Sequence, residues 1–222
     1  MSAHDNVFDR AFGAFLFDMD GTVLNSIAAA ERVWAAWAER HGVDVESFLP
    51  TIHGARAIDT IRRLNLPGVD AEAQAAFIAQ AEIDDVEGIV QIPGAAAFLD
   101  SLPAQRWAMV TSAPRDLALR RMAAAGIAEP AVMITAEDVT AGKPDPAGYR
   151  LAAQRLGFDP ADCLIFEDAT VGILAAEAAG AGLIVVTATH DHPIETAHGT
   201  LASYNSVEAR TDADGLIRLT KI

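Results

Sequence analysis

The stretch Phe17-Asp18-Met19-Asp20-Gly21-Thr22 sets two carboxylates at the end of a short apolar run that starts at Ala14. Four consecutive apolar residues are typical of a buried β-strand. In an extended chain, side chains two residues apart point the same way, so Asp18 and Asp20 face the same region, and Gly21 lets the chain turn sharply behind them. An isolated Asp-x-Asp can also be a plain acidic turn. The rest of the sequence has to decide between these interpretations.

Four more apolar runs have the length of buried strands, and segments with helical spacing link them. With the first run, they cover residues 14–17, 107–110, 132–135, 164–166 and 183–186. Strands that alternate with helices favour a parallel sheet with helices on both faces. The sequence therefore predicts an α/β fold with a doubly wound, Rossmann-like parallel sheet.

The segment between the first two strands, residues 26–92, is too long for an ordinary connection and contains no convincing strand pattern. Its helical candidates are residues 27–40, ended by Gly42, residues 56–64, ended by Pro67, and residues 70–86, ended by Gly88. We predict that residues 26–92 form a separate helical cap domain, called the cap below. Residues 1–25 and 93–222 are then the α/β core domain, in which residues 201–222 add a final strand or helix.

Polar motifs follow three of the later strands. They are Thr111-Ser112, Gly142-Lys143-Pro144-Asp145-Pro146 and Glu167-Asp168. Read alone, each has an ordinary interpretation as a helix cap, a turn lysine or a pair of acids at a helix start. Ligands of open α/β sheets bind in the crevice at the carboxyl ends of the strands, where all of these motifs are expected. Together with the two aspartates, they contain the groups that phosphoryl transfer needs.

The four motifs resemble those of the haloacid dehalogenase superfamily, within it the phosphatase branch that carries a helical cap of the C1 type after the first strand. The resemblance extends from residue 15 to about residue 189 and includes Phe-Glu-Asp-Ala-x-x-Gly-Ile at residues 166–173. It implies that Asp18 is the nucleophile that becomes an aspartyl-phosphate, and that Asp20 is the general acid and base. Thr111 and Lys143 would hold the transferring phosphoryl group.

The resemblance also implies a Mg²⁺ cofactor. The ion would be bound by the Asp18 carboxylate, the Asp20 main-chain carbonyl and Asp168, with Glu167 as a further ligand or just outside the ligand set. Lys143 would in addition screen Asp18 from its acidic neighbours.

The second aspartate separates the possible reactions within the superfamily. Dehalogenases lack it, because a departing halide needs no proton, whereas an alkoxide leaving group does. Asp20 therefore favours a phosphatase. One alternative is a sugar-phosphate mutase similar to β-phosphoglucomutase, but the position that carries a hinge histidine in that pattern is Ala30 here. A second alternative is a phosphometabolite-binding module without turnover.

In the cap, Thr51-Ile52-His53-Gly54-Ala55-Arg56 looks like the His-Gly-x-Arg segment of helical-capped sugar and polyol phosphatases, which act on glycerol phosphate or hexose phosphates. Donors at the start of a helix suit an anion or a ligand rich in hydroxyl groups. His53, Gly54, Arg56 and the core residue Ser112 are therefore the predicted substrate-binding residues. Asn25 stands where the family often has aspartate, and its effect on the cap hinge stays open.

Composition excludes several classes of partner. Of the 222 residues, 51% are hydrophobic, and 31 acidic against 16 basic side chains give a formal charge of -15, which disfavours nucleic acid and anionic lipid. The lone Cys163 excludes an intrachain disulfide, and neither a signal peptide nor a long apolar span is found. His190-Asp191-His192 is interpreted as a polar loop. We expect a cytoplasmic monomer that acts on a small phosphorylated metabolite.

Overall fold

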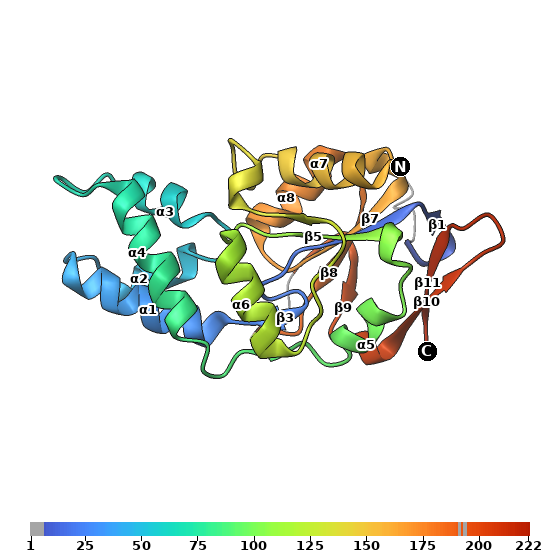
Figure 1. Ribbon diagram of the computed structural model, residues 1–222, viewed down its shortest axis with the longest axis horizontal. Helices are drawn as coiled ribbons and strands as arrows, with labels where there is room; N and C mark the ends of the chain where they lie inside the picture. Colours follow the sequence, from blue (N-terminus) through green and yellow to red (C-terminus); the bar gives the residue numbers. More distant parts are fainter. Residues whose placement is uncertain (1–6, 191, 193–194) are drawn as a thin grey trace.

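A computed structural model describes residues 7–190, 192 and 195–222, and a parallel sheet forms its centre (Figure 1). The strands of this sheet are β2 (Ala14–Phe17), β5 (Trp107–Val110), β6 (Met133–Ile134), β7 (Cys163–Glu167), β8 (Gly182–Val186) and β9 (Gly199–Leu201). Their order is β6-β5-β2-β7-β8-β9, with every neighbouring pair parallel. The five predicted strands and the α/β class are confirmed. The edge strand β9 was not predicted.

Alternating side chains of the central strand β2 point into two helical layers. Ala14 and Leu16 join the apolar cluster under α7 (Ala147–Leu156) and α8 (Thr170–Ala179). Phe15 and Phe17 join the cluster on the opposite face, which includes side chains of α5 (Ala95–Asp100) and α6 (Arg115–Ala125). All four β2 side chains are fully buried. The predicted doubly wound arrangement follows from this alternation.

Stacked aromatic rings hold β2 against β7. The rings of Phe17 and Phe166 lie parallel with their centroids 4.6 Å apart, and Phe15 meets Phe166 edge-on at 5.4 Å. Such pairs contribute roughly 0.5–1.5 kcal/mol beyond the burial of their surface. Because Asp18 directly follows Phe17 and Glu167 directly follows Phe166, this packing also fixes the spacing of two carboxylates.

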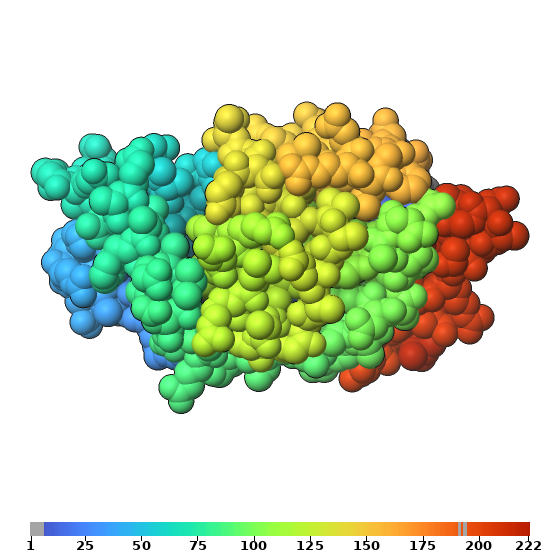
Figure 2. Space-filling view, viewed as in Figure 1, coloured from blue at the N-terminus to red at the C-terminus, as the bar shows by residue number. Residues whose placement is uncertain are grey.

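The helices of the cap are α1 (Ile27–Arg40), α2 (Val45–Phe48), α3 (Ala57–Leu64) and α4 (Ala71–Asp84). They enclose a cluster of their own, in which Trp34, Trp37 and Ile78 are buried. Figures 1 and 2 show them at one end of the molecule, opposite the C-terminal strands. The three predicted helices are confirmed within two residues at each end. The four residues of α2 are too few for a helical period, and it was missed.

A two-stranded ladder joins the cap to the core and corrects one expectation. β3 (Leu24–Asn25) pairs antiparallel with β4 (Val90–Gln91), so the two chain segments that cross between core and cap run side by side. The prediction that residues 26–92 contain no strand was wrong at β4, which is too short to show alternation. The Asn25 side chain accepts a hydrogen bond from the Ile27 amide at 3.1 Å, which closes a local turn directly before α1.

The C-terminal segment forms strands instead of a helix. β1 (Ala11–Phe12), β10 (Val207–Thr211) and β11 (Ile217–Lys221) make an antiparallel sheet of order β1-β11-β10 at the end of the molecule away from the cap (Figures 1 and 2). Ile217 and Leu219 of β11 are fully buried in the core cluster. Of the helices that the structure describes, none has the length and hydropathy needed to cross a bilayer.

Truncating the ring that joins β2 and β7 should destabilise the core. Phe166 is fully buried, so Phe166→Ala should lower the free energy of unfolding by about 3–5 kcal/mol, measured by urea denaturation. Leu174→Ala on the neighbouring helix α8 is the control, because Leu174 is 48% exposed and its truncation should change stability by no more than about 0.5 kcal/mol. Equal effects of the two substitutions would contradict this account of the core.

Candidate active site

Three buried carboxylates meet at the carboxyl ends of β2 and β7. Each of Asp18, Glu167 and Asp168 offers an oxygen, and these oxygens all lie within 4.8 Å of one another. The parallel register pairs Phe17 with Phe166, which places the next residues of both strands side by side. The cluster therefore follows from the strand pairing that the sequence predicted.

Lys143 lies between two of these carboxylates. Its Nζ donates to Oδ1 of Asp18 and, at 2.6 Å, to Oε1 of Glu167. Burial alone would lower the pKa of Lys143, but the charges of Asp18 and Glu167 outweigh burial and raise it. Burial raises the pKa of Asp18 to about 7, although Lys143 opposes the shift. Three carboxylates against one ammonium leave two excess negative charges when all are ionised.

This donor set fits a hard divalent cation. Burial and the charge of Glu167 raise the pKa of Asp168 well above its usual range, as expected where like charges are confined together. A cation with oxygen ligands relieves such repulsion, and Mg²⁺ is bound in proteins by one or two carboxylates together with water and phosphate oxygens. The three buried carboxylates are thus suited to the magnesium that the resemblance implies.

Neighbouring donors fix the orientation of Glu167. Its Oε1 accepts from the Tyr149 hydroxyl at 3.0 Å, and its Oε2 accepts from the backbone amides of Asp168 and Ala169 at 2.8 and 2.9 Å. Gly172 makes room for this carboxylate, since a Cβ there would lie 1.6 Å from Oε1. Only a glycine therefore fits at position 172 of the motif, because any side chain there would collide with the Glu167 carboxylate.

Asp168 is placed in a similar way from the other side. The Thr22 hydroxyl donates to its Oδ1 at 3.2 Å. Gly21 has φ +84°, and a Cβ at that position would lie 2.0 Å from Oδ2 of Asp168. Gly21 therefore serves both the turn after β2 and the close approach of the carboxylate.

Asp20 is held from two sides. Its Oδ1 accepts from the Ser26 hydroxyl at 2.5 Å and from Nη1 of Arg121 at 2.9 Å. Asp18 and Asp20 both line the same cleft, as their spacing predicted. Sequence reasoning missed Arg121, yet a signal was present, because residue 121 lies one helical turn from the buried Leu117 and Ala125.

The predicted phosphate-binding residues occupy the neighbouring strand end. Thr111 is buried, and its hydroxyl accepts from the Ala113 amide at 3.0 Å. Thr111 lies on a small cavity beside the cleft, together with Lys143 and Arg56. The hydroxyl of Ser112 donates to the carbonyl of Gly54 at 2.8 Å, which joins the core to the cap.

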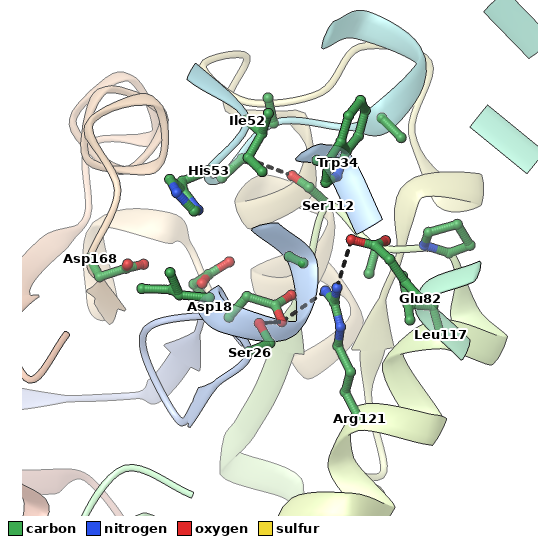
Figure 3. Close-up of a pocket in the computed structure, with 18 residues that line it drawn as sticks. Asp18, Ser26, Trp34, Ile52, His53, Glu82, Ser112, Leu117, Arg121 and Asp168 are labelled. Carbon is green, nitrogen blue, oxygen red and sulfur yellow. Dashed lines mark hydrogen bonds and ion pairs between the residues drawn. The ribbon is translucent and has the colours of Figure 1, made fainter. Parts of the chain in front are cut away.

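Two of the predicted cap residues, Gly54 and His53, reach the cleft. Gly54 has φ +75°, and a Cβ there would lie 2.7 Å from the Cβ of Ala169 in the core, so the cap approaches the core closely at this point. His53 points toward the side of the cleft that holds Asp18 and Asp168 (Figure 3), and its Nε2 lies 3.3 Å from Glu31.

Arg56, unlike His53, is among the residues that line the small cavity beside the cleft. Its guanidinium donates to Asp59 at 2.6 Å and to the carbonyls of Val139 and Thr140 at 3.0 and 3.1 Å. Arg56 thereby binds the cap to the chain segment that leads to Lys143.

The wall of the cleft combines apolar cap residues with polar groups. Ile27, Trp34 and Ile52 contribute from the cap, and Ala30 occupies the position that the mutase pattern fills with histidine. Of the predicted polar loop, Asp191 lies outside the described residues. His190 Nε2 lies 3.0 Å from the carbonyl of Asp168, a contact the sequence did not predict.

Known proteins are similar to this chain in both sequence and fold. Residues 12–180 match the family model described as haloacid dehalogenase-like hydrolase. Hexitol phosphatase A of Escherichia coli strain K12 is 43% identical over 81% of this chain and 85% of its own length. Glycerol-1-phosphate phosphohydrolase 2 of Saccharomyces cerevisiae is 33% identical over 80% of this chain and 76% of its own length.

A solved structure is similar to this chain in fold. The crystal structure of a hydrolase from Pseudomonas syringae superposes with a TM-score of 0.69 at 27% identity, covering 78% of this chain and 84% of the other. The family model alone spans most of the chain, including every motif at the strand ends. The chain therefore belongs to the haloacid dehalogenase-like hydrolase family.

Proposed function

We propose that this protein is a magnesium-dependent phosphatase that hydrolyses a small sugar or polyol phosphate through a phosphorylated Asp18. The observation that carries the proposal is the pair Asp18 and Asp20 on one cleft, with Lys143 and two further buried carboxylates beside Asp18. A nucleophile, an acid–base group and a cation site within one cleft are the parts that phosphoryl transfer requires.

In the first step, an oxygen of the Asp18 carboxylate attacks the phosphorus of the monoester. The bond from phosphorus to the leaving oxygen breaks, and its electron pair passes to that oxygen, which takes a proton from the carboxylic acid of Asp20. Lys143 and Thr111 hold the equatorial oxygens of the transferring group. The ammonium also favours the ionised form of Asp18, which partly offsets the larger rise in pKa that burial causes.

In the second step, Asp20, now a carboxylate, takes a proton from a water molecule while the water oxygen attacks the phosphorus. The bond between phosphorus and Asp18 breaks, which releases inorganic phosphate and restores the Asp18 carboxylate. The protonation state of Asp20 after each step is the one that the next step requires.

The metal would be held by the carboxylates of Asp18 and Asp168 and the main-chain carbonyl of Asp20, with Glu167 as a ligand or just outside the ligand set. When bound, Mg²⁺ supplies charge that stabilises the transferring phosphoryl group and orients it. Glu167 has its own donors in Tyr149 and Lys143, which hold it in place beside the ligands.

The leaving group would be selected by the cap, residues 26–92, while residues 1–25 and 93–222 carry the chemistry. The similarity to a hexitol phosphatase and a glycerol-1-phosphate phosphohydrolase supports a hydroxyl-rich leaving group. His53 and Ser112 lie on the cleft wall where such a group would bind. Ala30 offers no proton-transferring group in place of the mutase histidine, which favours hydrolysis over transfer within a sugar. A cytoplasmic monomer is part of the same proposal.

Removal of the metal should abolish turnover. In excess chelator, release of phosphate from para-nitrophenyl phosphate should fall by at least about 10²-fold, because metal charge stabilises the transition state by several kcal/mol. Added Mg²⁺ should restore the rate. Full activity in chelator would contradict the proposal.

The two aspartates should fail in different ways. Asp18→Asn should eliminate turnover, since an amide cannot form the intermediate. Asp20→Asn should lower kcat/KM for an alkyl phosphate by about 10²–10⁴-fold and by less for an aryl phosphate, whose leaving group needs little protonation. Steady-state kinetics on both substrates measure this. A near wild-type rate for Asp18→Asn would show that the nucleophile is wrongly assigned.

Arg56→Ala separates two roles for this residue. The sequence predicted a direct contact with substrate, but all three guanidinium nitrogens are engaged by Asp59, Val139 and Thr140. We therefore expect similar losses of kcat/KM for alkyl and aryl phosphates, about 10–10²-fold if hydrogen bonds to a charged group worth about 1.5–3 kcal/mol are lost. A loss confined to the sugar or polyol phosphate would instead support direct contact.

A further inference from the structure

A chain of three charged side chains, two of them buried, runs from the cap to Asp20. Arg121 on α6 places Nη1 2.9 Å from Oδ1 of Asp20 and Nη2 3.0 Å from Oε1 of Glu82 on cap helix α4. Figure 3 shows Arg121 extending from α6 toward Glu82, beside the floor of the cleft. The side chains of Arg121 and Glu82 are only 7% and 9% exposed. One guanidinium thus connects a cap residue with the acid–base group.

The arrangement is a poor device for stability alone. The Nε of Arg121 is buried and has no hydrogen-bond partner among the described residues. Taking two charges out of water costs free energy that the ion pair often fails to recover. Burial also raises the pKa of Glu82 to about 7 despite Arg121 beside it, which shows that burying the charged carboxylate is unfavourable too. A role in holding Asp20 would explain why a buried, partly unsatisfied guanidinium occupies this position.

Arg121 and Glu82 are also badly placed to bind substrate directly. Both lie on the cleft wall, but Nη1 and Nη2 of Arg121 are already occupied by Asp20 and Glu82. Little of either side chain remains open to a ligand. Their effect on the reaction must therefore pass through Asp20.

The contacts to Asp20 select one of its oxygens. Arg121 and Ser26 both donate to Oδ1, and no described residue donates a side-chain hydrogen bond to Oδ2. Two donors on one oxygen fix the plane of the carboxylate and leave Oδ2 as the oxygen for proton exchange. Accurate placement matters, because a shift of about 1 Å can cost about 10²-fold in rate.

We propose that Arg121 is a positioning residue for Asp20 and that Glu82 fixes Arg121, so that docking of α4 aligns the group that protonates the leaving oxygen. The inference rests on the proposed phosphatase function. It assigns to α4 a part in catalysis besides the selection of the leaving group. A substrate that needs protonation should depend on the chain Glu82, Arg121 and Asp20, and one that needs little should not.

The test compares kcat/KM for glycerol phosphate, an alkyl ester, with kcat/KM for para-nitrophenyl phosphate, an aryl ester. This parameter covers the steps up to departure of the leaving group, so it isolates the protonation by Asp20. Arg121→Met should lower kcat/KM for glycerol phosphate by about 10²-fold. Its loss of kcat/KM for the aryl ester should be smaller by a factor of at least about ten. Glu82→Gln should shift the ratio in the same direction by a smaller factor.

Arg120→Met is the matched control. Arg120 is the exposed neighbour on α6, and its Nε donates to the carbonyl of Ile83 on α4 at 3.3 Å, so it contacts the cap next to Glu82 but does not contact Asp20. Its substitution should leave the ratio of the two substrates unchanged. A change in ratio as large as that of Arg121→Met would assign the effect to docking of the cap and overturn the inference.

Arg121→Lys keeps the test decisive if Arg121→Met does not fold. A lysine retains the charge but cannot reach both carboxylates as a guanidinium fork does. It should recover part of the rate on glycerol phosphate and leave the aryl ester less affected. Equal losses on both substrates in a folded Arg121 variant would refute the positioning role. Absence of wild-type activity on both substrates would instead refute the proposed function.

Discussion

Three buried carboxylates lie around one ammonium at the carboxyl ends of β2 and β7, and the contacts around them are arranged by this excess of negative charge. Lys143 binds Asp18 and Glu167, while Asp168 faces a hydroxyl from the first turn. Two excess negative charges remain when all three acids are ionised. A phosphate ester, itself an anion, can approach such a site only when a cation offsets that charge. A divalent cation would offset these buried charges, which supports the magnesium dependence proposed above.

The cap and the core meet at contacts that end next to this site. Ser112 binds the carbonyl of Gly54, and Arg56 binds the backbone of Val139 and Thr140, on the segment that leads to Lys143. The third contact, from Glu82 through Arg121, reaches Asp20, the proposed acid–base group, so on this proposal a change in docking would change the geometry of proton transfer. On the proposed mechanism, these contacts would couple selection of the leaving group to the rate of the reaction.

Local patterns were enough to predict five of the six strands of the central sheet and the polar groups at their ends, because apolar runs and the residues after them are adjacent in sequence. Partners distant in sequence were not predictable in this way. Glu82 and Arg121 each occupy a buried helix stripe, which marks a charged residue as unusual but does not identify the other. Arg56 was recognised as a donor at a helix start, yet two of its acceptors, the carbonyls of Val139 and Thr140, come from a core loop. Two-residue strands such as β4 are too short to show the alternation of apolar and polar residues that predicts a strand.

The central claim is that the phosphoryl group passes through Asp18, and a chemical trap tests it directly. The enzyme is mixed with Mg²⁺ and glycerol phosphate, quenched in acid during turnover and treated with borohydride, which reduces an aspartyl-phosphate to homoserine. Mass spectrometry of the peptides should find homoserine at position 18. With para-nitrophenyl phosphate, whose leaving group needs little protonation, Asp20→Asn should increase its amount, because hydrolysis of the intermediate is slowed. Turnover without modification of Asp18, or modification at another residue, would contradict the account.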